Sequence, residues 1–274
     1  MNKFLLVATL LMASLFCEAQ NKPEGYTFTV VKENPITSIK NQANSGTCWS
    51  FAGVSMLESE LLRMGKGEFD LSEMYIVRRN YEDQARKYVR LHGSLNFSAG
   101  GSFADVFETI DEYGVVPQEE YMGLEYGEEN HKHGEVDHLL SGYVKAVIAN
   151  KNRKLTPVWF KGFNGILAAY FGAKPEQFNY NGKSYTPQSF AEELGLKSDN
   201  FVSLSSFTHH DFYTTFPVEV PDNWRWAESY NLPLDELIES IDYALMNGYT
   251  VAWATDVSEM GFTRSGLAIV PDLE

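Results

Sequence analysis

The sequence is poor in basic residues, and this shortage limits its partners. Lysine and arginine number 22 against 37 aspartate and glutamate residues, so the net charge is −15. Nucleic-acid binding needs clustered basic side chains that displace counterions from phosphates, and this composition has no such excess. The same charge disfavours an anionic membrane surface. We therefore expect no nucleic acid among the partners.

Long hydrophobic runs are also missing, apart from a short one at the N-terminus. After a positive start, residues 4–16 form an apolar core, and Ala19 ends a stretch that suits signal peptidase. The run is too short to cross ~30 Å of hydrocarbon comfortably. We expect a signal peptide over residues 1–19, export to the periplasm or the exterior, and no membrane anchor after cleavage. The alternative is a lipoprotein acylated on Cys17, although Phe16 stands where a small residue is expected.

Cysteine is scarce, since the chain contains only Cys17 and Cys48. Signal cleavage after Ala19 would leave Cys48 as the single thiol, which cannot form an internal disulfide. Three roles then stay open for this thiol in an exported protein: buried and inert, bridged to another chain, or reactive. The residues around Cys48 must decide between them.

What the chain does contain is the composition of a folded protein. Its 274 residues are 44% hydrophobic and 14% aromatic, enough for one large domain with a real core. Helical spacing runs from Cys48 to Gly65 and over 71–90, 104–113, 166–171, 187–194 and 234–247, and strand patterns cover 26–31 and 249–255. Helices thus come first and a buried strand late, an order that predicts an α+β fold.

The segment from Gln42 to Ala52 carries the chemistry. A Ser-Gly-Thr turn leads Cys48 directly into the first turn of an apolar helix. Unpaired backbone N–H groups and the helix dipole favour negative charge there, and thiolate is the reactive form of cysteine. Flanking Trp49 and Phe51 leave open that Cys48 is a core residue. Gln42 favours the reactive role, because its amide and the Cys48 N–H would together stabilise an oxyanion beside the sulfur.

This segment resembles the active-site segment of papain-like cysteine peptidases, which reads Gln-x-x-Ser-Gly-x-Cys-Trp-x-Phe-Ala here. Ser45 replaces a cysteine found in many members, which implies that the disulfide anchored there is absent. The Ser-Gly-x-Cys-Trp form is closer to the bleomycin hydrolase and aminopeptidase C branch. The resemblance implies a two-lobed fold, with Cys48 as the nucleophile and Gln42 as the oxyanion donor.

Later motifs extend the resemblance to about Val257. Leu-Ser-Glu at 71–73, Gly100-Gly101, Tyr-Gly-Val-Val-Pro at 113–117 and the stretch 248–257 all stand in the family's order. The resemblance implies that Gly100 and Gly101 pair with the substrate backbone and that Trp49 also belongs to the substrate site. Residues 125–200 stand where the branch carries a helical insertion.

One departure from the family is as informative as the matches. The family's catalytic histidine and asparagine follow the last of these motifs, but no histidine follows His210 here. We therefore expect a C-terminally truncated peptidase domain over residues 20–274, with its helical lobe complete and its sheet lobe incomplete. His209 and His210 precede the 234–247 helix, which is the wrong order for the missing base.

Other motifs are set aside. His131, His133 and His138 with neighbouring carboxylates fit no common zinc spacing, so we expect a solvated polar loop around residues 131–135 and no metal. No Gly-x-Ser-x-Gly elbow of a serine hydrolase is present.

The sequence therefore predicts a cysteine peptidase, aminopeptidase-like by its branch, that acts on peptide substrates without a cofactor. This length alone is expected to be inactive, and an oligomer is compatible with the sequence. The alternative is an inactive pseudopeptidase or peptide-binding module with the same fold.

Overall fold

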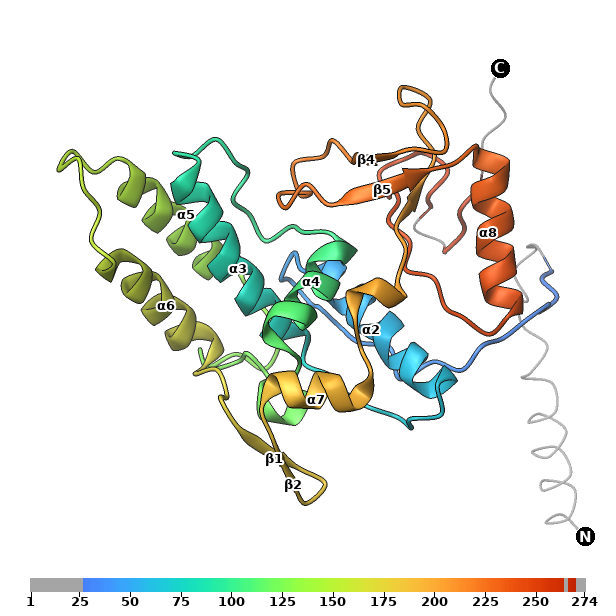
Figure 1. Ribbon diagram of the computed structural model, residues 1–274, viewed down its shortest axis with the longest axis horizontal. Coiled ribbons are helices and arrows are strands. Elements are labelled where there is room, and N and C mark those ends of the chain that lie inside the picture. Colours follow the sequence, from blue (N-terminus) through green and yellow to red (C-terminus); the bar gives the residue numbers. More distant parts are fainter. Residues whose placement is uncertain (1–26, 264–265, 270–274) are drawn as a thin grey trace, which may run out of the picture. The chain divides into compact units, whose positions relative to one another are not determined.

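The computed structural model describes residues 27–263 and 266–269 (Figure 1). The predicted signal peptide over residues 1–19 lies outside this range. The chain divides into two units between Glu33 and Asn34, and the architecture below concerns the second unit. In the first unit, residues 27–33 have no regular secondary structure, so the strand expected over 26–31 is not formed in its described part. No described helix is long and apolar enough to span a bilayer.

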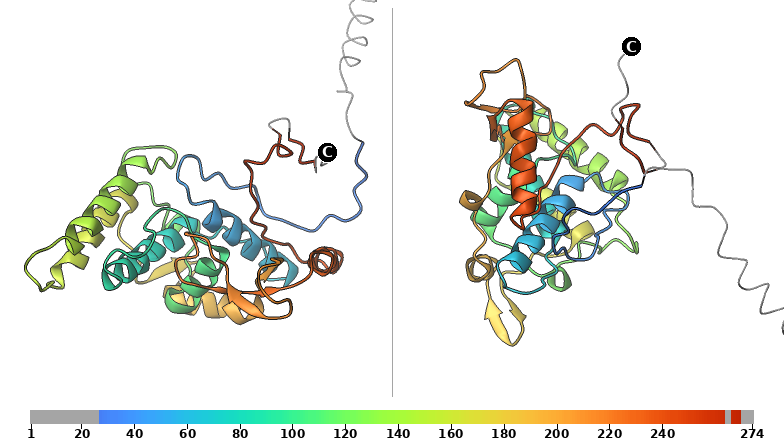
Figure 2. Two further views of the ribbon diagram at one scale, coloured as in Figure 1. Left: turned by 90° about the horizontal axis from the view of Figure 1, so that it is seen from above. Right: turned by 90° about the vertical axis from the view of Figure 1, so that its right-hand side faces the viewer.

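Helices dominate the second unit. They are α2 (Cys48–Arg63), α3 (Glu73–Arg90), α4 (Phe103–Tyr113), α5 (Gly134–Ile148), α6 (Val158–Phe171), α7 (Pro187–Leu194) and α8 (Leu234–Met246), with two 3-10 turns, η1 (Gln118–Glu120) and η2 (Ser198–Asn200). Helices α2, α3 and α4 pack against one another, and α5 and α6 lie side by side at one end of this group (Figures 1 and 2).

Local chemistry explains where the helices begin and end. The Ser72 hydroxyl accepts a hydrogen bond from the Tyr75 backbone N–H at 3.0 Å, which caps α3 at the position that its sequence predicts. Gly114 ends α4 with φ of 77°, and a Cβ there would lie 2.1 Å from the Pro187 carbonyl carbon. Only glycine fits this position, since it tolerates both the positive φ and the close approach of α7.

The residues that the structure describes also form two small sheets. Strands β1 (Phe178–Tyr180) and β2 (Lys183–Tyr185) form an antiparallel hairpin. Strands β3 (Leu204–Ser205), β4 (Thr215–Pro217) and β5 (Glu228–Asn231) form a sheet in the order β3-β5-β4, in which β3 is parallel and β4 antiparallel to β5. The fold is thus α+β, as the order of sequence patterns predicts, with a helical majority.

Three further sequence predictions are wrong in detail. The helix expected over 166–171 is the end of the longer α6, and Glu135, expected in a loop, lies in α5. The strand expected over 249–255 is not formed, and Trp253 within it is 75% exposed. A strand needs a neighbour for its backbone hydrogen bonds, and no described segment pairs with this one.

The hydrophobic core lies within the helical part. Leu57, Tyr75, Val106 and Phe163, from four different helices, are fully buried. By contrast, α8 has no buried residue. The helical part therefore has a packed core that can hold a site in place. The last described segments have no such core and carry exposed apolar side chains.

Candidate active site

Cys48 is the first residue of α2, and its thiol is free and exposed. The next three residues, Trp49, Ser50 and Phe51, are buried. The chain therefore turns its one described cysteine outward while its neighbours anchor the helix, which rules out a core role for Cys48. No hydrogen bond to the Cys48 sulfur is formed within the described residues.

The loop before Cys48 is shaped by its own side chains. The Asn41 Oδ1 accepts a hydrogen bond from the Ala43 N–H at 2.8 Å, and the hydroxyls of Ser45 and Thr47 lie 2.5 Å apart. Gly46 has φ of 67°, which glycine adopts without strain. These local bonds turn the chain sharply into α2, so that Cys48 lies directly after the loop as the first residue of the helix.

A buried segment holds the same loop from the other side. The Asn44 N–H donates to the His131 carbonyl at 2.9 Å, and the His133 N–H donates to the Asn44 carbonyl at 3.0 Å. Both imidazole rings are buried, so the expectation of a solvated polar loop is wrong. Burial lowers the pKa of His131 and lowers that of His133 to about 4, so both rings are neutral at pH 7. They serve as packing groups against the nucleophile loop.

The predicted substrate loop lies beside the same turn. The Trp49 indole N–H donates to the Ala99 carbonyl at 2.9 Å, and a Cβ on Gly101 would lie 2.8 Å from the Trp49 ring. A Cβ on Gly46 would lie 3.2 Å from that of Ala99. The structure therefore brings the glycine loop next to the first turn of α2. Trp49 is 4% exposed and supports the loop from beneath, while its direct contact with substrate stays a prediction.

Gln42 is half-buried on the nucleophile loop. Its side-chain amide has no hydrogen-bond partner within the described residues and is therefore free to donate to a substrate atom. Its role as oxyanion donor stays a prediction.

Sequence reasoning missed a carboxylate at this loop. Asp222 lies against Gly100, where a Cβ would meet the carboxylate carbon and both oxygens at 2.4 Å. It belongs to a turn over residues 218–227 that lies beside a hollow of about 390 Å³. The available signal was the Pro221-Asp222-Asn223 stretch, which is typical turn chemistry. That signal says nothing about which distant loop the turn contacts.

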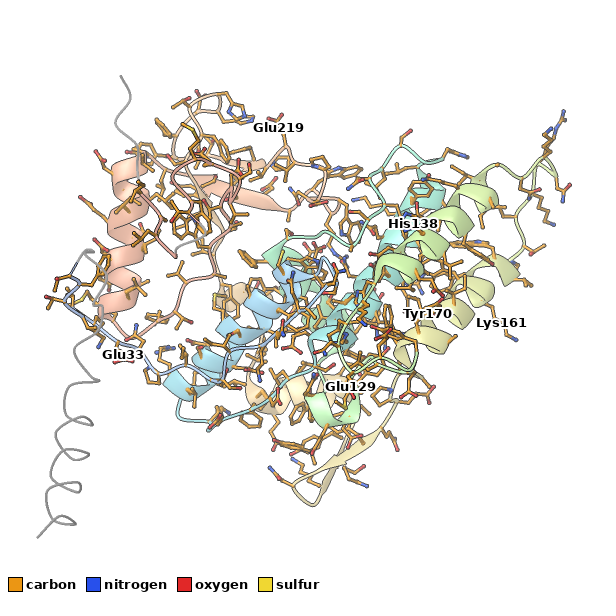
Figure 3. All side chains as sticks on the ribbon, turned by 180° about the vertical axis from the view of Figure 1, so that it is seen from behind. Glu33, Glu129, His138, Lys161, Tyr170 and Glu219 are labelled. Atoms are coloured by element: carbon orange, nitrogen blue, oxygen red, sulfur yellow. The ribbon has the colours of Figure 1, made fainter. Side chains whose placement is uncertain are left out.

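Three of the four other histidines bond to groups outside the nucleophile loop. His209 and His210 both point their Nε2 atoms at Glu219, at 3.0 and 3.4 Å, in an exposed group whose ligand atoms lie within 4.8 Å of one another. His138 bonds the Gly134 carbonyl on α5. Figure 3 shows His138 and Glu219 on separate parts of the fold. Among described residues, His131, His133 and His138 do not gather as metal ligands.

An exposed thiol at a helix N-terminus, next to a glycine loop, is typical of a thiol-dependent acyl-transfer protein. The family model "Papain family cysteine protease" matches residues 24–188, more than half of the chain. The chain belongs to the papain family of cysteine proteases.

Curated relatives place it near one branch. It is 24% identical over 276 residues to Aminopeptidase C of Streptococcus thermophilus, covering 84% of this chain and 61% of that protein. It is 24% identical over 283 residues to Aminopeptidase C of Lactobacillus delbrueckii subsp. lactis, covering 88% and 63%. This chain thus spans about six tenths of these relatives.

A solved structure agrees in fold. PepW from Lactobacillus rhamnosis HN001 superposes with a TM-score of 0.63 at 19% identity, covering 81% of this chain and 59% of that one. The likeness supports the papain-like α+β fold that the sequence motifs imply.

Proposed function

We propose that this protein is a cysteine peptidase that releases residues from the free N-terminus of peptides. The observation that carries the proposal is the exposed Cys48 at the start of α2, beside the Gly100–Gly101 loop. The aminopeptidase assignment is supported by the relatives that share most of this chain's length.

The geometry supports acyl transfer in two steps. The Cys48 thiolate adds to a peptide carbonyl, and the resulting oxyanion accepts hydrogen bonds from the Cys48 N–H and the Gln42 amide. Collapse forms a thioester and expels the amine, which must take up a proton to leave. Water then hydrolyses the thioester, releasing the acid and restoring the thiol. The missing side chains of Gly100 and Gly101 let Asp222 and Trp49 pack closely against this loop, whose backbone pairs with substrate in this proposal.

The proton donor is a separate question. All six histidines lie within the described residues, and none hydrogen-bonds the Cys48 sulfur. In this proposal the imidazole that protonates the leaving amine is not one of the six. In this proposal the 274 residues supply the nucleophile and the oxyanion donors, and the proton donor is supplied separately.

We also propose that the protein acts outside the cytoplasm on peptides, without a cofactor. The support is the signal-like pattern over residues 1–19 and the net charge of −15, which disfavours polyanionic ligands.

The test uses the reaction of Cys48 with two alkylating agents, leucine chloromethyl ketone, which keeps a free α-amino group, and iodoacetamide. In each, the sulfur displaces a halide, so neither needs a proton donor. The ratio of the two rate constants is measured for the protein and for glutathione, with Cys48→Ala as the control for labelling elsewhere. A ratio at least tenfold higher for the protein would show that the site binds aminoacyl groups. Equal ratios would show a thiol without a substrate site and would overturn the proposal.

A further inference from the structure

Asp222 occupies an unusual position for an exposed carboxylate. Its carboxylate carbon and both oxygens lie 2.4 Å from where a Gly100 Cβ would stand, so the group rests directly on the glycine Cα. Asn96 Nδ2 and Ser98 Oγ both donate to its Oδ1, at 3.1 and 3.3 Å. The Ser98 hydroxyl in turn accepts from the Gly100 N–H at 3.2 Å. The carboxylate is thus fixed to the loop that Trp49 holds beside Cys48.

The turn that carries Asp222 is firmly anchored. Arg225 donates from Nε to Asp105 Oδ1 at 2.8 Å and from Nη2 to Asp83 Oδ2 at 3.0 Å. Asn223 closes the turn, because its amide donates to the Val218 and Ala227 carbonyls and accepts from the Ala227 N–H. These contacts join the turn to α3 and α4, so the position of Asp222 does not depend on its own hydrogen bonds alone.

The charge of Asp222 is not neutralised. No cationic side chain forms an ion pair with it in the described part of the chain, and its Oδ2 has no donor there. The cation closest in sequence, Arg225, already faces the carboxylates of Asp83, Asp105 and Glu108. A positioned carboxylate with one open oxygen therefore stands at the end of the glycine loop.

We infer that Asp222 is a specificity-determining residue that binds the free α-ammonium group of a peptide substrate. The inference rests on the proposed peptidase function. A substrate whose backbone pairs with the Gly100–Gly101 loop extends away from Cys48 toward Asp222. There the carboxylate blocks a longer chain and attracts a terminal ammonium. The same residue thereby favours short N-terminal acyl groups and rejects internal ones.

The experiment compares leucine chloromethyl ketone with its N-acetyl form on the intact chain. Thiol ionisation affects both alkylation rates at Cys48 by the same factor, so its effect cancels in their ratio. We expect the free-amine reagent to be preferred at pH 6.5. Asp222→Asn should reduce the preference roughly two- to fivefold, the range of an exposed ion pair. Asp211→Asn, an exposed loop carboxylate, is the matched control and should leave the ratio unchanged.

A second measurement does not depend on a variant. The preference should decline as pH rises through about 8, where an α-amino group loses its charge. Repeating the comparison with leucyl-leucine chloromethyl ketone shows whether one or two residues separate the ammonium from Cys48.

The outcomes separate the two proposals. If Cys48 favours the acyl-amino-acid reagents but Asp222→Asn slows both forms equally, Asp222 only braces the loop and the inference is wrong. A wild-type ratio of one at every pH, for the leucyl and the leucyl-leucyl reagent alike, would also overturn the inference. If neither reagent outperforms iodoacetamide relative to glutathione, the proposed function itself fails.

Discussion

Arg225 and Asp105 form an ion pair, Nε to Oδ1 at 2.8 Å, that joins the 218–227 turn to α4. Asp105 is fully buried, and burial raises its pKa to about 6 although Arg225 opposes the rise. The pair therefore fixes the turn above the substrate loop and keeps a buried carboxylate charged at neutral pH.

Arg225→Met should destabilise the fold by on the order of 3 kcal/mol at pH 8, because it leaves the Asp105 charge without its partner. The folded-state pKa of Asp105 already exceeds the ordinary value of 3.8, so its contribution to stability falls as pH rises from about 4 to about 6. Without Arg225 the pKa of Asp105 rises further, so its contribution to stability continues to fall at higher pH. Urea unfolding should show a smaller loss at pH 5 than at pH 8.

The double variant Arg225→Met with Asp105→Asn is the control, since it removes the titrating group. Its loss of stability should be nearly the same at both pH values. An equal loss for the single variant at pH 5 and pH 8 would contradict this account of the pair.

Glu73, the acidic residue after the α3 N-cap, is 1% exposed, and burial raises its pKa to about 7. The folded state thus prefers the protonated form of Glu73. The stability that this preference contributes is fully present below about pH 4.5, the ordinary pKa of a glutamate. It is lost as pH rises toward 7, by ~1.4 kcal/mol per unit of pKa difference. Glu73→Gln should therefore gain stability relative to wild type as pH rises from 5 to 7.

Exposed Glu192 on α7 provides the comparison. The free energy of unfolding of Glu192→Gln, plotted against pH, should run parallel to that of wild type. The difference between variant and wild type is the informative quantity, because His133 titrates with the opposite sign. Burial lowers its pKa to about 4, so its contribution is lost as pH falls below about 6.5. A constant difference between Glu73→Gln and wild type over pH 5–7 would show that Glu73 is charged in the fold.

Gln42→Ala should slow acylation of Cys48 by an aminoacyl p-nitrophenyl ester by about 10²–10³, the effect of losing one oxyanion donor. The ester's leaving group needs no proton, so the reaction isolates the oxyanion site. Alkylation by iodoacetamide passes through no oxyanion and should keep its rate. Release of p-nitrophenolate in a stopped-flow instrument measures the first reaction, and Gln188→Ala on α7 is the control.

An equal slowing of both reactions would assign Gln42 a structural role in the loop. An unchanged acylation rate would show that Gln42 is not part of the active site.

The sequence predicts most of the helical part because its signals are local. Ser72 begins a helix through its side-chain hydroxyl and Gly114 ends one through its backbone freedom, and the structure places both as expected. The turn into Cys48 is equally local. The burial of His131 and His133 was not predictable, since it depends on pairing with Asn44, about ninety residues earlier in the chain.

Asp222 shows the same limit at the site. Its turn chemistry is visible in the sequence, but its contact with Gly100 depends on the Arg225 ion pairs with α3 and α4. The strand expected over 249–255 fails for a related reason, because a strand pattern does not supply the neighbour with which a strand must pair.

The 274-residue chain should not turn over peptide amides. The amine of a tetrahedral intermediate leaves as a poor anion unless an acid protonates it, and such help is typically worth 10²–10⁴ in rate. Buried His131 and His133 are neutral packing groups, while His209 and His210 bond Glu219. Incubation with a fluorogenic leucyl amide should give no Cys48-dependent signal, whereas the p-nitrophenyl ester should still acylate Cys48. Amide turnover that disappears in Cys48→Ala would mean that a histidine of this chain reaches the thiol. If it also disappears in His209→Asn/His210→Asn, that pair supplies the proton, and the mechanism proposed for this chain must change accordingly.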